Sequence, residues 1–89
     1  MARMEYAEGF AYDVAQIWSP SVEKHLRSLL QMIEAFPQSG LTLVPESLVR
    51  EFGPQVRKCA MSPFYLVYEY DEDADVVFVH GLVRQSKAW

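Results

Sequence analysis

The fold is decided by residues 56–83, which read VRKCAMSPFYLVYEYDEDADVVFVHGLV. Their apolar residues alternate with others and are rich in β-branched and aromatic types, the pattern of half-buried strands. Three segments fit it: Val56–Met61, Phe64–Asp71 and Val76–Val83. Ser62-Pro63 and Asp71–Asp75 separate them as turns. Three consecutive strands with short turns predict an antiparallel meander.

The segment before this stretch has a helical period instead. Its apolar stripe has the i, i+4, i+7 spacing of an amphipathic helix and comprises Val22, Leu26, Leu29, Leu30, Ile33 and Phe36. Ser19-Pro20 is a typical helix start, because serine accepts a bond from an orphan N–H and proline needs no partner in the first turn. Pro37 ends the helix, since the residue before a proline avoids helical dihedrals.

Another helix is predicted on the N-terminal side of this one. Its stripe consists of Phe10, Val14, Ile17 and Trp18, and we expect this helix to end near Ser19. Two helices joined so tightly form an antiparallel hairpin. Residues Arg3 to Ala7 predict a short strand with Met4 and Tyr6 on one face.

The connection between the helices and the meander is mostly loop. Residues Gln38 to Pro45 include Gly40 and predict a loop, and Glu46 to Phe52 predicts a helical turn closed by Gly53-Pro54. Helices followed by strands define an α+β, two-layer fold in which the helical hairpin packs on a small antiparallel sheet. A chain this short has material for one core, so we expect residues 1–89 to form a single domain.

Composition narrows the classes of function. Apolar residues make up 51% of the chain, which argues against intrinsic disorder. The net charge of −4 opposes long-range attraction to nucleic acid, so any such binding needs a local basic patch. Five acids share one short window: Glu69, Asp71, Glu72, Asp73 and Asp75. A single cysteine without a Cys/His cluster predicts neither a disulfide nor a metal, and no cofactor is expected.

Targeting signals are also missing from the sequence. No basic region precedes a long apolar run, and no apolar segment approaches the roughly 18 residues of a membrane span. We therefore expect a cytoplasmic protein that does not bind membranes.

Few polar side chains fall on the sheet face that the hairpin leaves uncovered, or at the strand ends. Arg57 and Lys58 open the first meander strand, and they are either functional cations or a solvated edge that discourages association. His80 is interpreted as a partly buried sheet histidine rather than a general base, because nothing near it in sequence would orient it. Cys59 is interpreted as a small buried apolar residue.

The C-terminal residues offer another set of candidates. Arg84, Lys87 and Trp89 follow the last strand. The tryptophan has three possible roles, to stack on a base, to pack on the sheet or to be covered by a partner, and packing is favoured. No nucleophilic triad, phosphate-binding glycine loop or paired catalytic carboxylates are found. Only acid–base chemistry by scattered Arg, Lys, Tyr or His remains open.

The order of these elements resembles the RelE/ParE toxin superfamily over nearly the whole chain. The hairpin contains SPSVEKHLRSLLQMIEAFP, residues 19–37, and the meander contains VRK followed by PFYLVYEYDEDADVVFVHGLVRQ. Family members show a basic residue on the first of these strands, an hVYE strand, an aliphatic strand and a basic tail. The resemblance implies the toxin of a type II toxin–antitoxin system, which inhibits growth.

Two targets follow from the resemblance. RelE-like members cleave mRNA on the ribosome, which would give Arg57, Lys58, Tyr65 and Arg84 catalytic roles here. Such members usually carry an arginine where this chain has Tyr65, carry a tyrosine where it has Trp89, and are strongly basic. ParE-like members instead inhibit DNA gyrase through protein contacts.

The resemblance also implies a partner. A cognate antitoxin would wrap the toxin as a hetero-oligomer, and an acidic antitoxin would meet Arg57, Lys58, Arg84 and Lys87. His80, Lys87 and Trp89 are the candidate binding residues. The competing hypotheses are a non-toxic, degenerate member that acts only as a protein-binding module, and an unrelated α+β domain.

Overall fold

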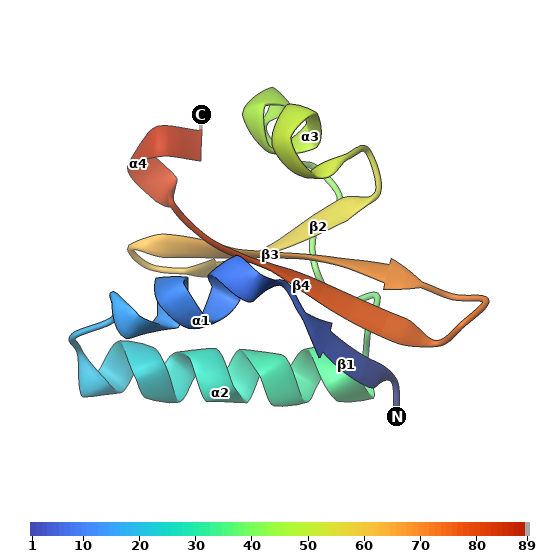
Figure 1. Cartoon of the computed structure of the whole chain (residues 1–89), viewed down its shortest axis with the longest axis horizontal. Coiled ribbons are helices and arrows are strands. Elements are labelled where there is room, and N and C mark those ends of the chain that lie inside the picture. Colours follow the sequence, from blue (N-terminus) through green and yellow to red (C-terminus); the bar gives the residue numbers. More distant parts are fainter. Residues whose placement is uncertain (89) are drawn as a thin grey trace.

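The computed structural model describes residues 1–88, and Trp89 lies outside the described residues. The elements in chain order are β1 (Arg3–Tyr6), α1 (Glu8–Ala15), α2 (Pro20–Ala35), α3 (Glu46–Phe52), β2 (Val56–Met61), β3 (Phe64–Asp71), β4 (Val76–Arg84) and α4 (Gln85–Ala88). The strands form one sheet in the order β1-β4-β3-β2, with β1 parallel to β4 and the other pairs antiparallel. The α+β class and the helical hairpin against the sheet are confirmed (Figure 1). Across residues 1–88, no helix has the length and apolarity that a membrane crossing requires.

Helix α2 begins as its sequence predicts. The Ser19 Oγ accepts a bond from the backbone N–H of Val22, and Pro20 occupies the first turn. Leu26 and Ile33 from the apolar stripe are buried. Phe36 was expected on that stripe, but it is 68% exposed because it caps the helix with non-helical dihedrals and turns away from the core.

Helix α1 is shorter than its stripe suggests. It ends at Ala15, and Ser19 adopts the extended conformation that an N-cap of α2 requires. The four residues between the helices therefore reverse the chain direction instead of extending α1. Phe10 is buried as expected, but Trp18 is 91% exposed, so its predicted place in the core is wrong.

The larger core lies between the helical hairpin and one face of the sheet. Leu26 and Ile33 from α2 pack there with side chains that alternate along the strands. The buried strand residues are Cys59, Met61, Phe64, Leu66, Tyr68, Val77 and Val79. This layer corresponds to the predicted two-layer arrangement.

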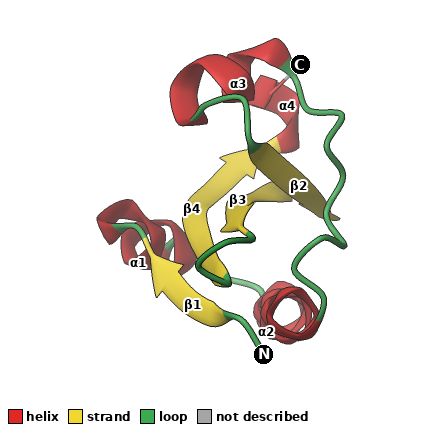
Figure 2. Cartoon of the chain, turned by 90° about the vertical axis from the view of Figure 1, so that its right-hand side faces the viewer, coloured by secondary structure: helices red, strands yellow, loops and turns green. Residues whose placement is uncertain are grey.

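The opposite face is not open, contrary to the expectation from the sequence. Helices α3 and α4 lie over part of it, as Figure 2 shows at the top of the view. Leu48 of α3 and Ala88 of α4 form a second, smaller core with Val56 and Val67. The four-residue helix α4 had no sequence signal, because its burial depends on contacts with α3 and β3 rather than on a period of its own.

A β-bulge interrupts the pairing of β3 with β4. Val67 pairs with Gly81 and Tyr68 with Val79, which leaves His80 without a counterpart on β3. Asp13 of α1 accepts a hydrogen bond at its Oδ2 from the N–H of Leu82, at 3.1 Å. A Cβ at Gly81 would lie 2.5 Å from the same oxygen, so a larger residue here would displace the Asp13 carboxylate.

Candidate functional site

Lys58 and Tyr65 come together on the face beneath α3 and α4. They lie on adjacent antiparallel strands, and the Lys58 Nζ is 4.5 Å from the centroid of the Tyr65 ring. Lys58 is only 8% exposed, which is rare for a lysine because burial of an ammonium group is costly. The cation over the ring compensates part of that cost. These are the two candidate catalytic residues that the structure brings into contact.

Helix α4 closes this region through defined hydrogen bonds. The Ser47 Oγ of α3 donates to the carbonyl of Ala88 at 2.6 Å. Gln85 donates from its backbone to the Pro63 carbonyl at 2.9 Å and from its side chain to the Phe64 carbonyl at 3.0 Å. The turn between β2 and β3 and helix α3 therefore hold α4 at both of its ends.

Arg57 points to the other face of β2 and is engaged in holding a loop. Its Nη1 donates to the carbonyls of Gln38 and Gly40, both at 3.0 Å. The buried Tyr68 hydroxyl holds the same loop, because it accepts from the Gly40 N–H and donates to the Pro37 carbonyl, each at 2.8 Å. Burial raises the pKa of Tyr68. The guanidinium of Arg57 thus has a structural role, which the sequence did not suggest.

Arg84 points to a different side of the sheet from Lys58, although both were predicted to be catalytic residues. Its guanidinium is 5.3 Å from the centroid of the Phe64 ring, on the side of the sheet that faces the helical hairpin. Lys87 lies on α4 and is exposed. Trp89, the remaining predicted binding residue, is outside the described residues.

His80 has a partner that the sequence analysis missed. Its Nε2 is 2.7 Å from the Oε1 of Glu69 on β3, and Phe52 of α3 and Phe78 lie against the imidazole with centroids 5.0 Å away. Glu69 is eleven residues away in sequence, but its position in the alternation of β3 places it on the same face as Tyr65. That alternation was the available signal, and it could be used only once the register across the bulge was known.

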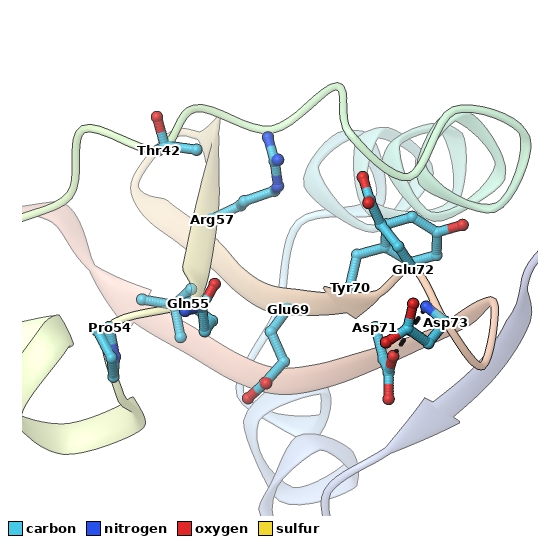
Figure 3. A pocket seen from close by; sticks show the side chains of 10 residues that line it. Thr42, Pro54, Gln55, Arg57, Glu69, Tyr70, Asp71, Glu72 and Asp73 are labelled. Carbon is cyan, nitrogen blue, oxygen red and sulfur yellow. Dashed lines mark hydrogen bonds between the residues drawn. The ribbon is translucent and has the colours of Figure 1, made fainter.

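A depression beside this face is acidic. It lies where β2 begins and β3 ends, and Figure 3 shows the carboxylates of Glu69, Asp71, Glu72 and Asp73 around it with Arg57. Near this depression, the side-chain amide of Gln38 donates a hydrogen bond to the carboxylate of Glu72. A depression with this lining repels phosphate groups.

The acidic turn between β3 and β4 is internally bonded. Asp71 Oδ1 accepts from the backbone N–H groups of Asp73 and Ala74, an arrangement typical of an Asx turn. The Tyr70 hydroxyl donates to Asp75 at 2.6 Å, and this bond raises the pKa of Tyr70 to about 12. The interpretation of this acidic run as a solvated turn agrees with these contacts.

The chemistry available to these residues is limited. Burial raises the pKa of the Cys59 thiol, so it is a poor nucleophile. Within residues 1–88 no group of three His, Cys, Asp or Glu side chains is arranged to hold a metal ion. Arg57, Lys58 and Arg84 point to different surroundings and do not converge on one point. The arrangement fits a binding surface with a covered Lys–Tyr pair better than a preassembled phosphate-cleaving centre.

The geometry defines an α+β protein with a helical hairpin on one sheet face and a partly covered polar face opposite. Solved structures share this arrangement. The chain superposes on a chain in the crystal structure of the intact E. coli RelBE toxin–antitoxin complex with a TM-score of 0.71 and 19% identity, covering 94% of this chain and 96% of that one. No family model and no curated protein matches it in sequence.

Two further structures give the same result. The isolated E. coli RelE toxin matches with a TM-score of 0.70 and 17% identity, over 94% of this chain and 84% of that one. A mutant E. coli RelE in complex with a peptide of its antitoxin RelB matches with a TM-score of 0.68 and 21% identity, over 98% and 90%. The chain therefore has the fold of the RelE toxin, as the sequence resemblance implied.

Proposed function

We propose that this chain is the toxin of a type II toxin–antitoxin pair, a single cytoplasmic domain that arrests growth and is neutralised by a cognate antitoxin in a hetero-oligomer. The observation that carries the proposal is the shared fold with RelE in its complex with an antitoxin, over 94% of the chain. Lys87, His80 and Trp89 remain candidate contacts for the partner, and the exposed Lys87 suits an acidic one.

We favour DNA gyrase as the target, which ParE-like toxins inhibit through protein contacts. Cleavage of mRNA requires several cationic or phenolic groups around one phosphate. Here Arg57 is bonded to loop carbonyls, Lys58 is buried on the face beneath α3 and α4, and Arg84 faces the other side of the sheet. The acidic depression beside this face adds to the argument, because it disfavours an RNA backbone.

Ribosome-dependent mRNA cleavage is the second candidate. The contact between Lys58 and Tyr65 favours it, because a lysine beside a tyrosine can charge and align a phosphate. In this mechanism the buried Lys58 must become accessible to the phosphate. The two targets therefore differ in whether Lys58 is needed.

Induction in a bacterial host tests both the toxin proposal and its target. Incorporation of radiolabelled thymidine and amino acids is followed after induction of the wild type, of Lys58→Met, and of Arg50→Gln as a matched control. Arg50 lies exposed on the neighbouring helix α3, so its replacement removes one charge without disturbing the Lys58–Tyr65 contact. If gyrase is the target, thymidine incorporation falls first and all three proteins act alike.

The other outcomes are equally clear. An early fall in amino-acid incorporation that Lys58→Met alone relieves would replace gyrase with mRNA cleavage. If neither label responds to the wild type at a level confirmed by immunoblot, the chain is not a toxin, and the protein-binding module takes its place. Arg57→Ala is unsuitable for this test, because it also releases the loop at Gln38 and Gly40.

A further inference from the structure

A groove lies at the end of the molecule opposite the acidic turn between β3 and β4. The connection between α1 and α2 forms one wall and the turn between β2 and β3 forms the other, at the left of Figure 1. Its main lining residues are Ile17, Trp18, Val22, Pro63, Phe64 and Arg84. We refer to it as the Trp18 groove.

The exposure of Trp18 is unusual for so large an apolar side chain. At 91% exposure the indole contributes nothing to the core, although burying an aromatic side chain is among the largest gains available to a fold. Ile17 beside it does pack against the core, so the chain direction here does not force every side chain outward. A tryptophan in this position fits a surface that a partner covers.

The residue types of the groove match the centre of protein interfaces. Tryptophan and arginine dominate the binding energy of such interfaces, and charged residues other than arginine are depleted there. Arg84 lies over the Phe64 ring, with 5.3 Å between the guanidinium carbon and the ring centroid. Its positive charge thus lies in the same groove that Trp18 lines.

The charged residues around the groove indicate which charge the partner carries. Among residues 1–88, no acidic residue lines the Trp18 groove, and Glu23 at the start of α2 is paired with Arg27 at 2.8 Å. The acidic cluster at Asp71 to Asp75 is on the opposite end of the sheet (Figure 1). The cation of Arg84 therefore favours an anionic group beside an apolar one.

An acidic peptide satisfies this chemistry better than single-stranded RNA. Grooves for single strands carry several cations along the backbone path in addition to stacking platforms, whereas Arg84 is the one cation among the described residues that line this groove. Gln16 and Ser19 also line it, and its other described lining side chains are aliphatic, aromatic or proline, which suits one apolar side chain followed by a carboxylate. The occupant is thus a peptide segment with an apolar anchor and an acid.

The inference we draw is that the Trp18 groove receives an acidic segment of the antitoxin, with an apolar side chain against Trp18 and Phe64 and a carboxylate on Arg84. It rests on the proposed function, because an antitoxin is the partner that function requires. It adds a contact surface away from Lys58 and α4, so the antitoxin would reach the hairpin side of the sheet as well.

The test uses the full-length chain labelled with 5-fluorotryptophan and the product of the neighbouring gene as antitoxin. The chain has two tryptophans, so two fluorine resonances are expected, and Trp18→Phe assigns them. On binding, the Trp18 resonance should lose its shift between H₂O and D₂O because the indole becomes buried. By calorimetry, Trp18→Ala should weaken binding roughly 30-fold or more and Arg84→Gln roughly 10-fold.

Matched controls come from exposed positions outside the Trp18 groove. Tyr12→Ala removes another exposed aromatic side chain and Arg50→Gln another exposed cation, and both should bind as the wild type does. Circular dichroism checks that each variant is folded. Since Trp18 is almost fully exposed, Trp18→Ala should leave the fold intact.

Three results would overturn the inference. If the complex forms while the Trp18 resonance keeps its solvent shift and Trp18→Ala binds normally, the groove is not the contact surface, but the proposed function stands. If no complex forms, both fail. If a short oligonucleotide buries Trp18 and the antitoxin does not, the occupant is a nucleic acid.

Discussion

The two faces of the sheet differ in what their side chains do. The face under α1 and α2 is filled with apolar residues from both helices and all of the strands. The face under α3 and α4 has a core of four buried residues, and beside it lie Lys58, Tyr65, and the His80–Glu69 pair. Stability and candidate function are therefore carried largely by opposite faces, and substitutions can address them separately.

The largest losses of unfolding free energy should come from substitutions in the two cores. Ile33→Ala, in the larger core, should cost about 3–5 kcal/mol of unfolding free energy, because its cavity is enclosed by well-packed neighbours. Leu48→Ala, in the smaller core, should cost about 2–3 kcal/mol, since the neighbouring half-buried residues can relax into the space. Urea unfolding measures both. A larger loss for Leu48→Ala would contradict the division between the faces.

The loop that Arg57 and Tyr68 hold gives the next effect. Tyr68→Phe removes only the hydroxyl, but it leaves the Gly40 N–H and the Pro37 carbonyl without their partner. We expect a loss of about 1–3 kcal/mol, measured by urea unfolding. Tyr70→Phe is the control, because its hydroxyl bonds to an exposed carboxylate, and it should change stability much less. Equal losses in the two variants would argue against a structural role for this loop.

The larger core also predicts a dependence of stability on alkaline pH. Burial raises the pKa of Cys59 above its ordinary value of 9.0, so the folded state binds the thiol proton more tightly than the unfolded chain does. The resulting stability is fully present below about pH 9 and is lost as the pH rises through the folded-state pKa. The urea midpoint should therefore fall as the pH is raised above about 9. In Cys59→Ala this fall should be smaller, and an unchanged profile would show that the thiol does not contribute.

The smallest effect is expected for the His80–Glu69 pair. Glu69 is partly exposed, so solvent screens the interaction despite the separation of 2.7 Å. A double-mutant cycle with His80→Ala and Glu69→Gln should give a coupling of about 0–1 kcal/mol. A coupling well above this range would mean that the functional face contributes to stability more than its small core suggests.

Much of the fold was accessible from the sequence because local signals determine it. The bounds of β2 and β3 were predicted correctly, since alternating residues and two turns define them. The start of α2 followed from Ser19-Pro20. The parallel pairing of β1 with β4 had no such signal, because it joins segments about seventy positions apart.

The wrong predictions of buried side chains have one physical origin. The periodicity of apolar residues shows their spacing, but it does not show where a helix ends. Trp18 and Phe36 have the correct spacing for their helices, but each lies where the chain leaves the helix and turns outward. The site was harder to predict for a related reason. Its pairs, Lys58 with Tyr65 and His80 with Glu69, depend on strand register and on the bulge. Whether the predicted site residues act in function stays a prediction.

The most direct test of the account is colony survival after induction of this chain, with and without co-expression of the protein from the neighbouring gene. The account predicts that induction alone reduces survival by orders of magnitude and that co-expression restores it, with the two proteins purifying together. Unchanged survival at a confirmed level of folded protein would contradict the proposal that this RelE fold carries a toxin.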